Sequence, residues 1–361
     1  MSCTTARRVL EPRAVPLRPS IRFMIRVSCL LLFSACGSQP QDATLEFSGI
    51  SMGTGYTVKL LPPADGIDTA SLGKKISAIL ESVDTRMSTY LPGSELSRLN
   101  SNPSLEWIPV SPELFTVLQL ALEVSRITNG TFDITVGRLV NLWGFGPEQV
   151  PETIPDEGTI RREAEKTGYF KLRLDAATSS IRKTQPDLYI DLSGIAQGYA
   201  ADRVADALDA VPVENYLIDV SGEIRASGHN GSGQEWRIGI EKPDSGVRTV
   251  KRIIELRRSG MATSGDYRNF YVRNGKRYAH IIDPRTGHPI EHQLASVSVL
   301  HESAALADAL ATGLLVLGTE PARTLAEQNG IAAYFLTRSG EGFTESYTPL
   351  FAPYLAGDAG E

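Results

Sequence analysis

The segment Asp187-Leu-Tyr-Ile-Asp-Leu-Ser-Gly-Ile-Ala-Gln-Gly-Tyr-Ala-Ala-Asp202 decides the fold of this chain. Its first part is mostly apolar and predicts a short buried strand over residues 188–192. Ser193 and Gly194 break that strand, and apolar residues at helical spacing then predict a helix that ends near Leu208. A strand followed by a tight turn and an amphipathic helix is typical of folds in which helices cover a sheet.

The start of this predicted helix also indicates a ligand site. Gly194 and Gly198 leave bare backbone at the first turn, where free N–H groups and the helix dipole favour an anion such as a phosphate. Asp191 ends the expected strand, at the place where ligands bind in open α/β sheets. An ordinary strand, turn and helix with a capping serine would show the same pattern, and this segment alone leaves both interpretations open.

The N-terminus predicts a secretory signal peptide over residues 1–35. This region holds six Arg and one Glu, and an apolar run over 27–33 precedes Ser34, Ala35 and Cys36. The run is too short to span a membrane as a mature helix. Cysteine after Ser-Ala resembles a bacterial lipobox, in which Cys36 would be lipidated and become the mature N-terminus. A plain cleaved signal with an incidental cysteine is the alternative.

A lipidated Cys36 implies a protein anchored by its lipid on the periplasmic side of the bacterial envelope, at the inner or outer membrane. Residues 36–43 would then form a polar tether. All three cysteines lie in the leader region, so the mature chain has no disulfide, no cysteine-ligated zinc and no cysteine nucleophile. Without residues 1–35 the chain keeps 30 basic and 41 acidic residues, a net charge of −11, which argues against a nucleic-acid binder.

The rest of the chain predicts one folded body. About 320 residues follow the tether without a linker or a repeat, enough for one large or two intertwined α/β units. We expect a catalytic domain over 44–350 and a C-terminal tail over 351–361. Interleaved helices and strands predict a mixed α/β or α+β fold, with antiparallel strands in the second half. The predicted elements are a hairpin (44–50 with 56–61), further helices (72–83, 112–128, 304–316, 321–328) and further strands (216–220, 236–241, 253–256, 278–282, 295–300, 332–336).

Asp308 and Thr312 form the clearest candidate metal site. They lie one turn apart on one face of the predicted helix 304–316, and that face is otherwise Ala and Leu. An unpaired carboxylate is costly in such surroundings. A carboxylate and a hydroxyl suit Mg²⁺, which takes few protein oxygens and completes its shell with water and phosphate. A buried Asp bonded to the backbone is the alternative.

Several other polar stretches are ordinary when each is considered alone. Residues 262–269 predict a polar loop that could present Arg268 to a phosphate or a partner, and His280 falls on a predicted strand. Together, however, seven motifs occur in a fixed order. They are Met52-Gly-Thr54, Met87-Ser-Thr-Tyr90, Gly130-Thr-Phe-Asp133, Asp191-Leu-Ser-Gly-Ile-Ala-Gln-Gly198, Thr263-Ser-Gly-Asp-Tyr-Arg268, His280-Ile-Ile-Asp-Pro284 and Asp308-Ala-Leu-Ala-Thr312.

This series resembles the ApbE-like FAD:protein FMN transferases, a family of bacterial envelope lipoproteins, and extends from about residue 45 to about residue 336. The resemblance implies a single T-fold-like catalytic body. Members of that family bind FAD and Mg²⁺. They transfer FMN to a Thr or Ser hydroxyl of an acceptor protein, for example a membrane redox subunit, and release AMP.

Carried over by motif, the resemblance assigns residues to each part of the site. The carbonyl of Gly194 and the side chains of Asp308 and Thr312 would hold Mg²⁺, and His280 would act as a base or position the acceptor hydroxyl. The FAD site would include Met52, Tyr90, Thr131, Phe132, Asp133, Asp191, Gln197 and Ile282.

The chain departs from the family pattern at three places. Thr131 and Phe132 replace smaller or different residues of some relatives, which would alter the packing around a bound ring. Gln197 stands where many relatives have Lys, so a contact there would be neutral, and Ser221-Gly222-Glu223 replaces a double-glycine turn. Two other functions stay open. An FAD pyrophosphatase would use the same site with water as the nucleophile, and the motifs do not separate it from a transferase. A non-catalytic flavin-binding lipoprotein is disfavoured because Asp308 and Thr312 are both present.

Overall fold

The computed structural model describes residues 44–63, 66–147, 151–244 and 249–355. The expected signal peptide, the lipidation site Cys36 and the tether lie outside these residues. Among the described helices, none is both long enough and apolar enough to cross a membrane.

An eight-stranded sheet forms the centre of the fold, and all of its neighbouring strands are antiparallel. In spatial order its strands are β1 (Leu45–Ser51), β2 (Thr54–Leu60), β6 (Tyr216–Val220), β7 (Glu223–Ser227), β10 (Arg258–Gly265), β13 (Leu294–His301), β14 (Ala332–Ser339) and β15 (Gly342–Tyr347). The fold is therefore mixed α/β, as the sequence predicts, and the antiparallel pairing extends to the first hairpin as well.

Three small sheets are inserted between strands of the large one. One is formed by β3 (Ile108–Pro109), β4 (Leu172–Asp175) and β5 (Ser180–Lys183). A hairpin of β8 (Trp236–Glu241) and β9 (Val250–Leu256) comes between β7 and β10 in the chain. A second hairpin, of β11 (Phe270–Arg273) and β12 (Lys276–Ala279), comes between β10 and β13.

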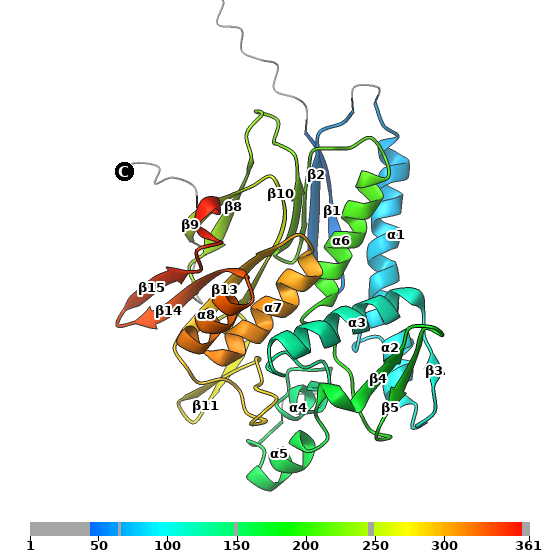
Figure 1. The fold of residues 1–361 in the computed structure, drawn as a ribbon, viewed down its shortest axis with the longest axis vertical. Coiled ribbons are helices and arrows are strands. Elements are labelled where there is room, and N and C mark those ends of the chain that lie inside the picture. The colour runs from blue at the N-terminus through cyan, green and yellow to red at the C-terminus, as the bar shows by residue number, and fades with distance from the viewer. Residues whose placement is uncertain (1–43, 64–65, 148–150, 245–248, 356–361) are drawn as a thin grey trace, which may run out of the picture. The chain divides into compact units, whose positions relative to one another are not determined.

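Helices cover one face of the large sheet (Figure 1). The helices that contact this face are α1 (Thr69–Met87), α6 (Ala196–Asp209), α7 (Ala304–Leu317) and α8 (Thr319–Gln328). Of the others, α2 (Glu95–Ser101) packs on α1, α3 (Pro112–Ile127) packs on α7, and α4 (Gly137–Leu142) and α5 (Glu157–Ala164) pack on each other. Short 3-10 turns occur at η1 (Tyr169–Lys171) and η2 (Ala352–Tyr354). The main core lies between α1, α3, α6, α7 and this face. Side chains alternate between the two faces of each strand, so other residues of the same strands, such as Met261, point to the opposite face. There they pack with β8, β9 and Phe351.

The strand expected over residues 188–192 is wrong, although the helix after it is present as α6. The segment is extended and buried but joins no sheet among the described residues. The side chain of Asn100 replaces a neighbouring strand: it accepts a hydrogen bond from the Ile190 N–H and donates one to the Ile190 carbonyl, both at 2.8 Å. The Asp191 N–H donates to the Ile134 carbonyl at 2.7 Å. Buried apolar residues require a paired backbone, and a side-chain amide can provide the pairing.

The structure also differs from the sequence prediction at the expected loop over residues 262–269 and at the expected C-terminal tail. Residues 262–265 are not a loop but the end of β10, an interior strand with β7 on one side and β13 on the other. The expected C-terminal tail begins with residues that pack on the body, because Phe351 is fully buried and Leu355 pairs with Ile254. Strand β10 therefore brings polar side chains into the middle of the sheet.

Candidate functional site

A cavity of about 900 Å³ opens where the turns of the large sheet meet the starts of α6 and the middle of α7. Ligand pockets in proteins commonly measure about 300 to 1,000 Å³, so this one has room for a large ligand. All but one of the expected site residues that the structure describes line it. They are Tyr90, Thr131, Phe132, Asp133, Asp191, Gly194, Gln197, His280, Ile282, Asp308 and Thr312.

Met52 is the exception, since it does not line the cavity and packs against the main core. It forms the two-residue turn between β1 and β2 together with Gly53, and both residues have positive φ, at 52° and 72°. Such a turn fixes the register of the hairpin. The next residue, Thr54, does line the cavity, and its hydroxyl donates to the Ser221 hydroxyl at 3.0 Å.

The expected metal ligands meet at the wall formed by α7. The Asp308 side chain is 6% exposed, and its carboxylate accepts a long hydrogen bond of 3.4 Å from the Gly198 N–H. Burial raises the pKa of Asp308 to about 7. The Thr312 hydroxyl lies 2.8 Å from the Ser264 hydroxyl, and a Cβ on Gly194 would lie 3.4 Å from the same Thr312 oxygen. The turn before α6 and one face of α7 are therefore in contact.

Glu223 is a site residue that the sequence did not assign. It is the first residue of β7, pairs with Val220, lines the cavity and is 8% exposed. Burial raises the pKa of Glu223 well above its usual value, and the negative charge of Asp308 raises it further. The signal in the sequence was the Ser221-Gly222 turn, because a two-residue hairpin turn places Glu223 on the same face as the buried Val220.

The oxygen donors of this wall fit Mg²⁺. Two buried carboxylates in one cavity are unfavourable without a compensating cation. The described residues contain no cluster of three or more His, Cys, Asp or Glu side chains suited to a metal. Mg²⁺ does not need such a cage, since it binds through one or two carboxylates and keeps water and phosphate as further ligands. Asp308, Thr312 and the Gly194 carbonyl would supply the protein oxygens.

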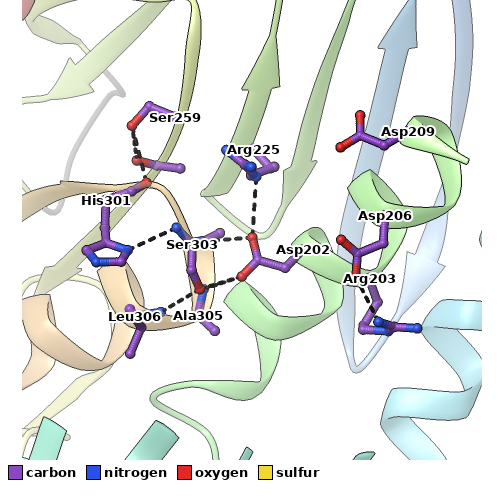
Figure 2. A network of polar contacts seen from close by, with 12 residues as sticks. Asp202, Arg203, Asp206, Asp209, Arg225, Ser259, His301, Ser303, Ala305 and Leu306 are labelled. Carbon is purple, nitrogen blue, oxygen red and sulfur yellow. Dashed lines mark hydrogen bonds and ion pairs between the residues drawn. The ribbon is translucent and has the colours of Figure 1, made fainter. Parts of the chain in front are cut away.

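Asp202 fixes the start of α7 relative to α6 and β7 (Figure 2). Its carboxylate accepts hydrogen bonds from the Ser303 hydroxyl at 2.6 Å and from the N–H groups of Ala304 and Ala305 at 2.9 and 3.0 Å. Its Oδ1 also lies 3.5 Å from Nε of Arg225 on β7. One carboxylate thus satisfies free N–H groups at the helix start. Asp308 follows Ala304 by one turn, so the same contacts position the proposed metal site.

Two glycines allow α7 to approach its neighbours closely. A Cβ on Gly198 of α6 would lie 2.3 Å from the Ala304 carbonyl oxygen, and a Cβ on Gly260 of β10 would lie 2.7 Å from the Ala304 nitrogen. The N–H of Gly198 is directed at Asp308. The prediction that Gly198 offers bare backbone to an anion is therefore wrong, because α7 covers this glycine, whereas Gly194 lines the cavity.

The segment over 131–135 is held by its own polar groups. The Thr131 hydroxyl donates to the Gly313 carbonyl of α7 at 2.8 Å. Asp133 accepts from the N–H and hydroxyl of Thr135 at 2.8 and 2.6 Å, and from the Tyr169 N–H at 2.7 Å. These bonds hold the cavity wall in place and leave the ring of Phe132 beside Gly194.

His280 lies just after β12 rather than within a strand, and it is half-buried at the cavity wall. Its Nδ1 lies 3.0 Å from the Asn269 carbonyl oxygen. Because a carbonyl oxygen only accepts, the neutral imidazole carries its proton on Nδ1, which leaves Nε2 as an acceptor. Burial lowers the pKa of His280 and favours this neutral form. The ring also packs edge-on against Phe145, whose carbonyl accepts from the Tyr90 hydroxyl at 3.1 Å.

The chain matches the model of the ApbE family over residues 52–335. It belongs to the ApbE family. Its relatives include the FAD:protein FMN transferase of Vibrio cholerae, 42% identical over 334 residues, 92% of this chain and 99% of the relative. The Escherichia coli protein of the same name is 38% identical over 340 residues, 92% of this chain and 97% of the relative.

Solved structures of ApbE proteins share this fold. The flavin transferase ApbE from Vibrio cholerae has a TM-score of 0.80 and 41% identity, and the match covers 87% of this chain and 99% of that one. The apo form of the flavinyl transferase ApbE from Pseudomonas stutzeri also has a TM-score of 0.80, with 39% identity and coverage of 88% and 98%. The motifs that pointed to this family surround one cavity in the structure, apart from the Met52 turn at its edge.

Proposed function

We propose that this chain is an FAD:protein FMN transferase, which moves FMN from FAD to a hydroxyl of an acceptor protein. The observation that carries the proposal is the match over nearly the whole of both chains to relatives of that name, at about 40% identity. The large cavity supports it, because FAD is a long dinucleotide and the wall formed by α7 offers a place for its pyrophosphate. The enzyme is accordingly a transferase.

The proposed reaction is a phosphoryl transfer. The acceptor hydroxyl attacks the FMN phosphorus of FAD and forms a new P–O bond, while the bond to the AMP phosphate breaks and AMP leaves. Mg²⁺, when bound, would neutralise charge on the pyrophosphate and stabilise the leaving AMP. Asp308, Thr312 and the Gly194 carbonyl would hold the cation, and the chain needs no nucleophile of its own.

The remaining cavity residues position the two reactants. Tyr90, Phe132, Asp191, Gln197 and Ile282 line the cavity and would contact bound FAD, with Thr131 and Asp133 holding the wall behind them. His280, neutral and with Nε2 as acceptor, takes the proton of the acceptor hydroxyl or orients that hydroxyl. Met52 is assigned by motif and shapes the entrance through the β1–β2 turn.

The anchoring of the enzyme is also a proposal. Cys36 carries the lipid, residues 36–43 form the tether, and the catalytic body faces the periplasmic side of the envelope. This placement is supported by the basic leader, its apolar run and the small residues before Cys36.

One experiment tests the reaction. The purified protein is mixed with FAD and an acceptor protein that carries a family-type flavinylation threonine, with and without Mg²⁺, and the products are separated on a denaturing gel. We expect a fluorescent acceptor band and released AMP with Mg²⁺ only, and neither with Asp308→Asn. AMP and free FMN without a labelled acceptor would replace the transferase by a pyrophosphatase. Bound FAD without products would indicate a flavin carrier.

A further inference from the structure

Glu223 is a buried carboxylate to which the proposed reaction gives no role. It lines the cavity, and its side chain is more than nine-tenths buried at the start of β7. Its Oε2 is buried and makes no hydrogen bond to any described residue. A buried carboxylate oxygen without a donor is costly, because it gives up its hydration and receives nothing in exchange. A buried, unpaired carboxylate oxygen that faces a cavity indicates that a bound ligand supplies its missing partner.

The nearby arginines do not supply that ligand. Arg225 lies two residues further along β7, on the same face, but its Nε is directed at Asp202 at 3.5 Å, and its Nη1 makes no hydrogen bond to a described residue. Arg268 donates to Glu241 at 2.6 Å. Each of these arginines thus already has a carboxylate partner other than Glu223.

Asp308 is the second buried acid that lines this cavity. Its carboxylate has the single long hydrogen bond from Gly198, and the negative charges of Asp308 and Glu223 act on one another. Two carboxylates that share a buried space are both ionised only when a cation lies near both, and otherwise one of them binds a proton. We propose that Glu223 is the second carboxylate of the cation site and binds the same divalent cation as Asp308, directly or through a water on that cation.

This inference rests on the proposed function, because the cation is the Mg²⁺ of the transfer reaction. It adds a second negative charge to the site and so raises its affinity for the metal. Mg²⁺ sites built from one or two carboxylates and substrate phosphates are common in phosphoryl-transfer enzymes.

Direct cation binding tests the assignment without turnover. Mg²⁺ is titrated into the protein by calorimetry, and Mn²⁺ is followed by electron paramagnetic resonance, both in the absence of FAD. We expect Glu223→Gln to weaken binding about 10- to 100-fold, the usual effect of removing a supporting group at a metal site. Glu223→Asp, which keeps the charge, should lose less. Glu241→Gln removes the same charge from the same cavity and is the matched control, with binding close to that of the wild type.

The outcomes separate this inference from the proposed function. Wild-type cation affinity in Glu223→Gln, together with lost binding in Asp308→Asn, would overturn the role of Glu223 and leave the metal site intact. Wild-type affinity in Asp308→Asn would overturn the metal site itself. Equal weakening in Glu223→Gln and Glu241→Gln would show an effect of total charge only and would also overturn the inference.

A stability measurement guards against a misfolded variant. Without cation, Glu223→Gln should unfold at or above the wild-type temperature, because the change removes a buried unpaired carboxylate. Added Mg²⁺ should then raise the unfolding temperature of the variant less than that of the wild type. An unstable Glu223→Gln that Mg²⁺ restores fully would contradict the proposal.

Discussion

Replacing Gly198 by Ala tests whether the close approach of α6 and α7 builds the proposed cation site. The new Cβ would lie 2.3 Å from the Ala304 carbonyl oxygen and 2.8 Å from Cα of Ala305. Both atoms belong to the backbone, so no side-chain rotation relieves the contact. Ordinary van der Waals contact begins near 3.4 Å, and the two helices must therefore separate by roughly 1 Å.

The expected cost follows from this separation. Overpacking of this kind destabilises proteins by about 1–3 kcal/mol, and the better helix propensity of Ala offsets at most about 1 kcal/mol. We expect a net loss of about 1–2 kcal/mol in the free energy of unfolding. Because Asp308 follows Ala304 by one turn, the same shift moves the proposed metal ligand, and a displacement of about 1 Å can lower a catalytic rate about 100-fold.

Urea denaturation, cation titration and the FMN transfer assay measure these effects. The matched control is Gly73→Ala in the interior of α1, where the new Cβ would meet only the ring of Phe47 at 3.2 Å. That ring can move, so we expect the control to be as stable as the wild type and fully active. A Gly198→Ala protein with the stability and cation affinity of Gly73→Ala would refute the reasoning.

Two more predictions concern the groups around α7. Asp202→Asn removes one of the acceptor oxygens that bind Ser303, Ala304 and Ala305, so the unfolding free energy should fall by about 1–3 kcal/mol. Asp206→Asn, on an exposed residue of the same helix, should change it little, and equal losses in denaturation would contradict the role of Asp202. The folded pKa of Asp308 is about 7 against 3.8 for the unfolded chain, so the cation-free protein should lose stability as pH rises from about 4 to 7. Thermal unfolding across this range should show the loss in the wild type and a smaller one in Asp308→Asn, and identical profiles would exclude this cause.

Much of the fold follows from local patterns in the sequence. The limits of α3 could be predicted because Ser111 caps its first turn, Pro112 occupies its first position, and Gly130 follows its end with φ of 81°. The apolar spacing of α6 and α7 and the alternation of β6 and β13 are equally local signals. The ordered motifs likewise predicted which parts of the chain share a cavity, since each contributes residues to it and Met52 is the one assigned site residue of the described chain outside its lining.

The failures have a common physical cause, which is that the deciding partner lies far away in the chain. Residues 188–192 have the composition of a strand, but the amide of Asn100, ninety positions earlier, satisfies their backbone. Gly198 resembles a phosphate-binding glycine until α7, more than a hundred residues later, is seen to cover it. Glu223 becomes a candidate site residue only because the fold brings it into one cavity with Asp308. No local pattern contains this information.

The cavity draws its walls from stretches that extend from Thr54 to Val316. The wall that carries Asp308, the proposed cation ligand, requires the turn at Gly194, the start of β7 and the middle of α7 to come together. Contacts between such distant parts of a chain carry a large loop-closure entropy and form late in folding. A nascent, truncated or partly unfolded chain therefore has no partial site with which to capture or cleave a flavin nucleotide. The cavity is complete only when α7 has packed against these distant segments, so binding of the substrate requires the whole fold.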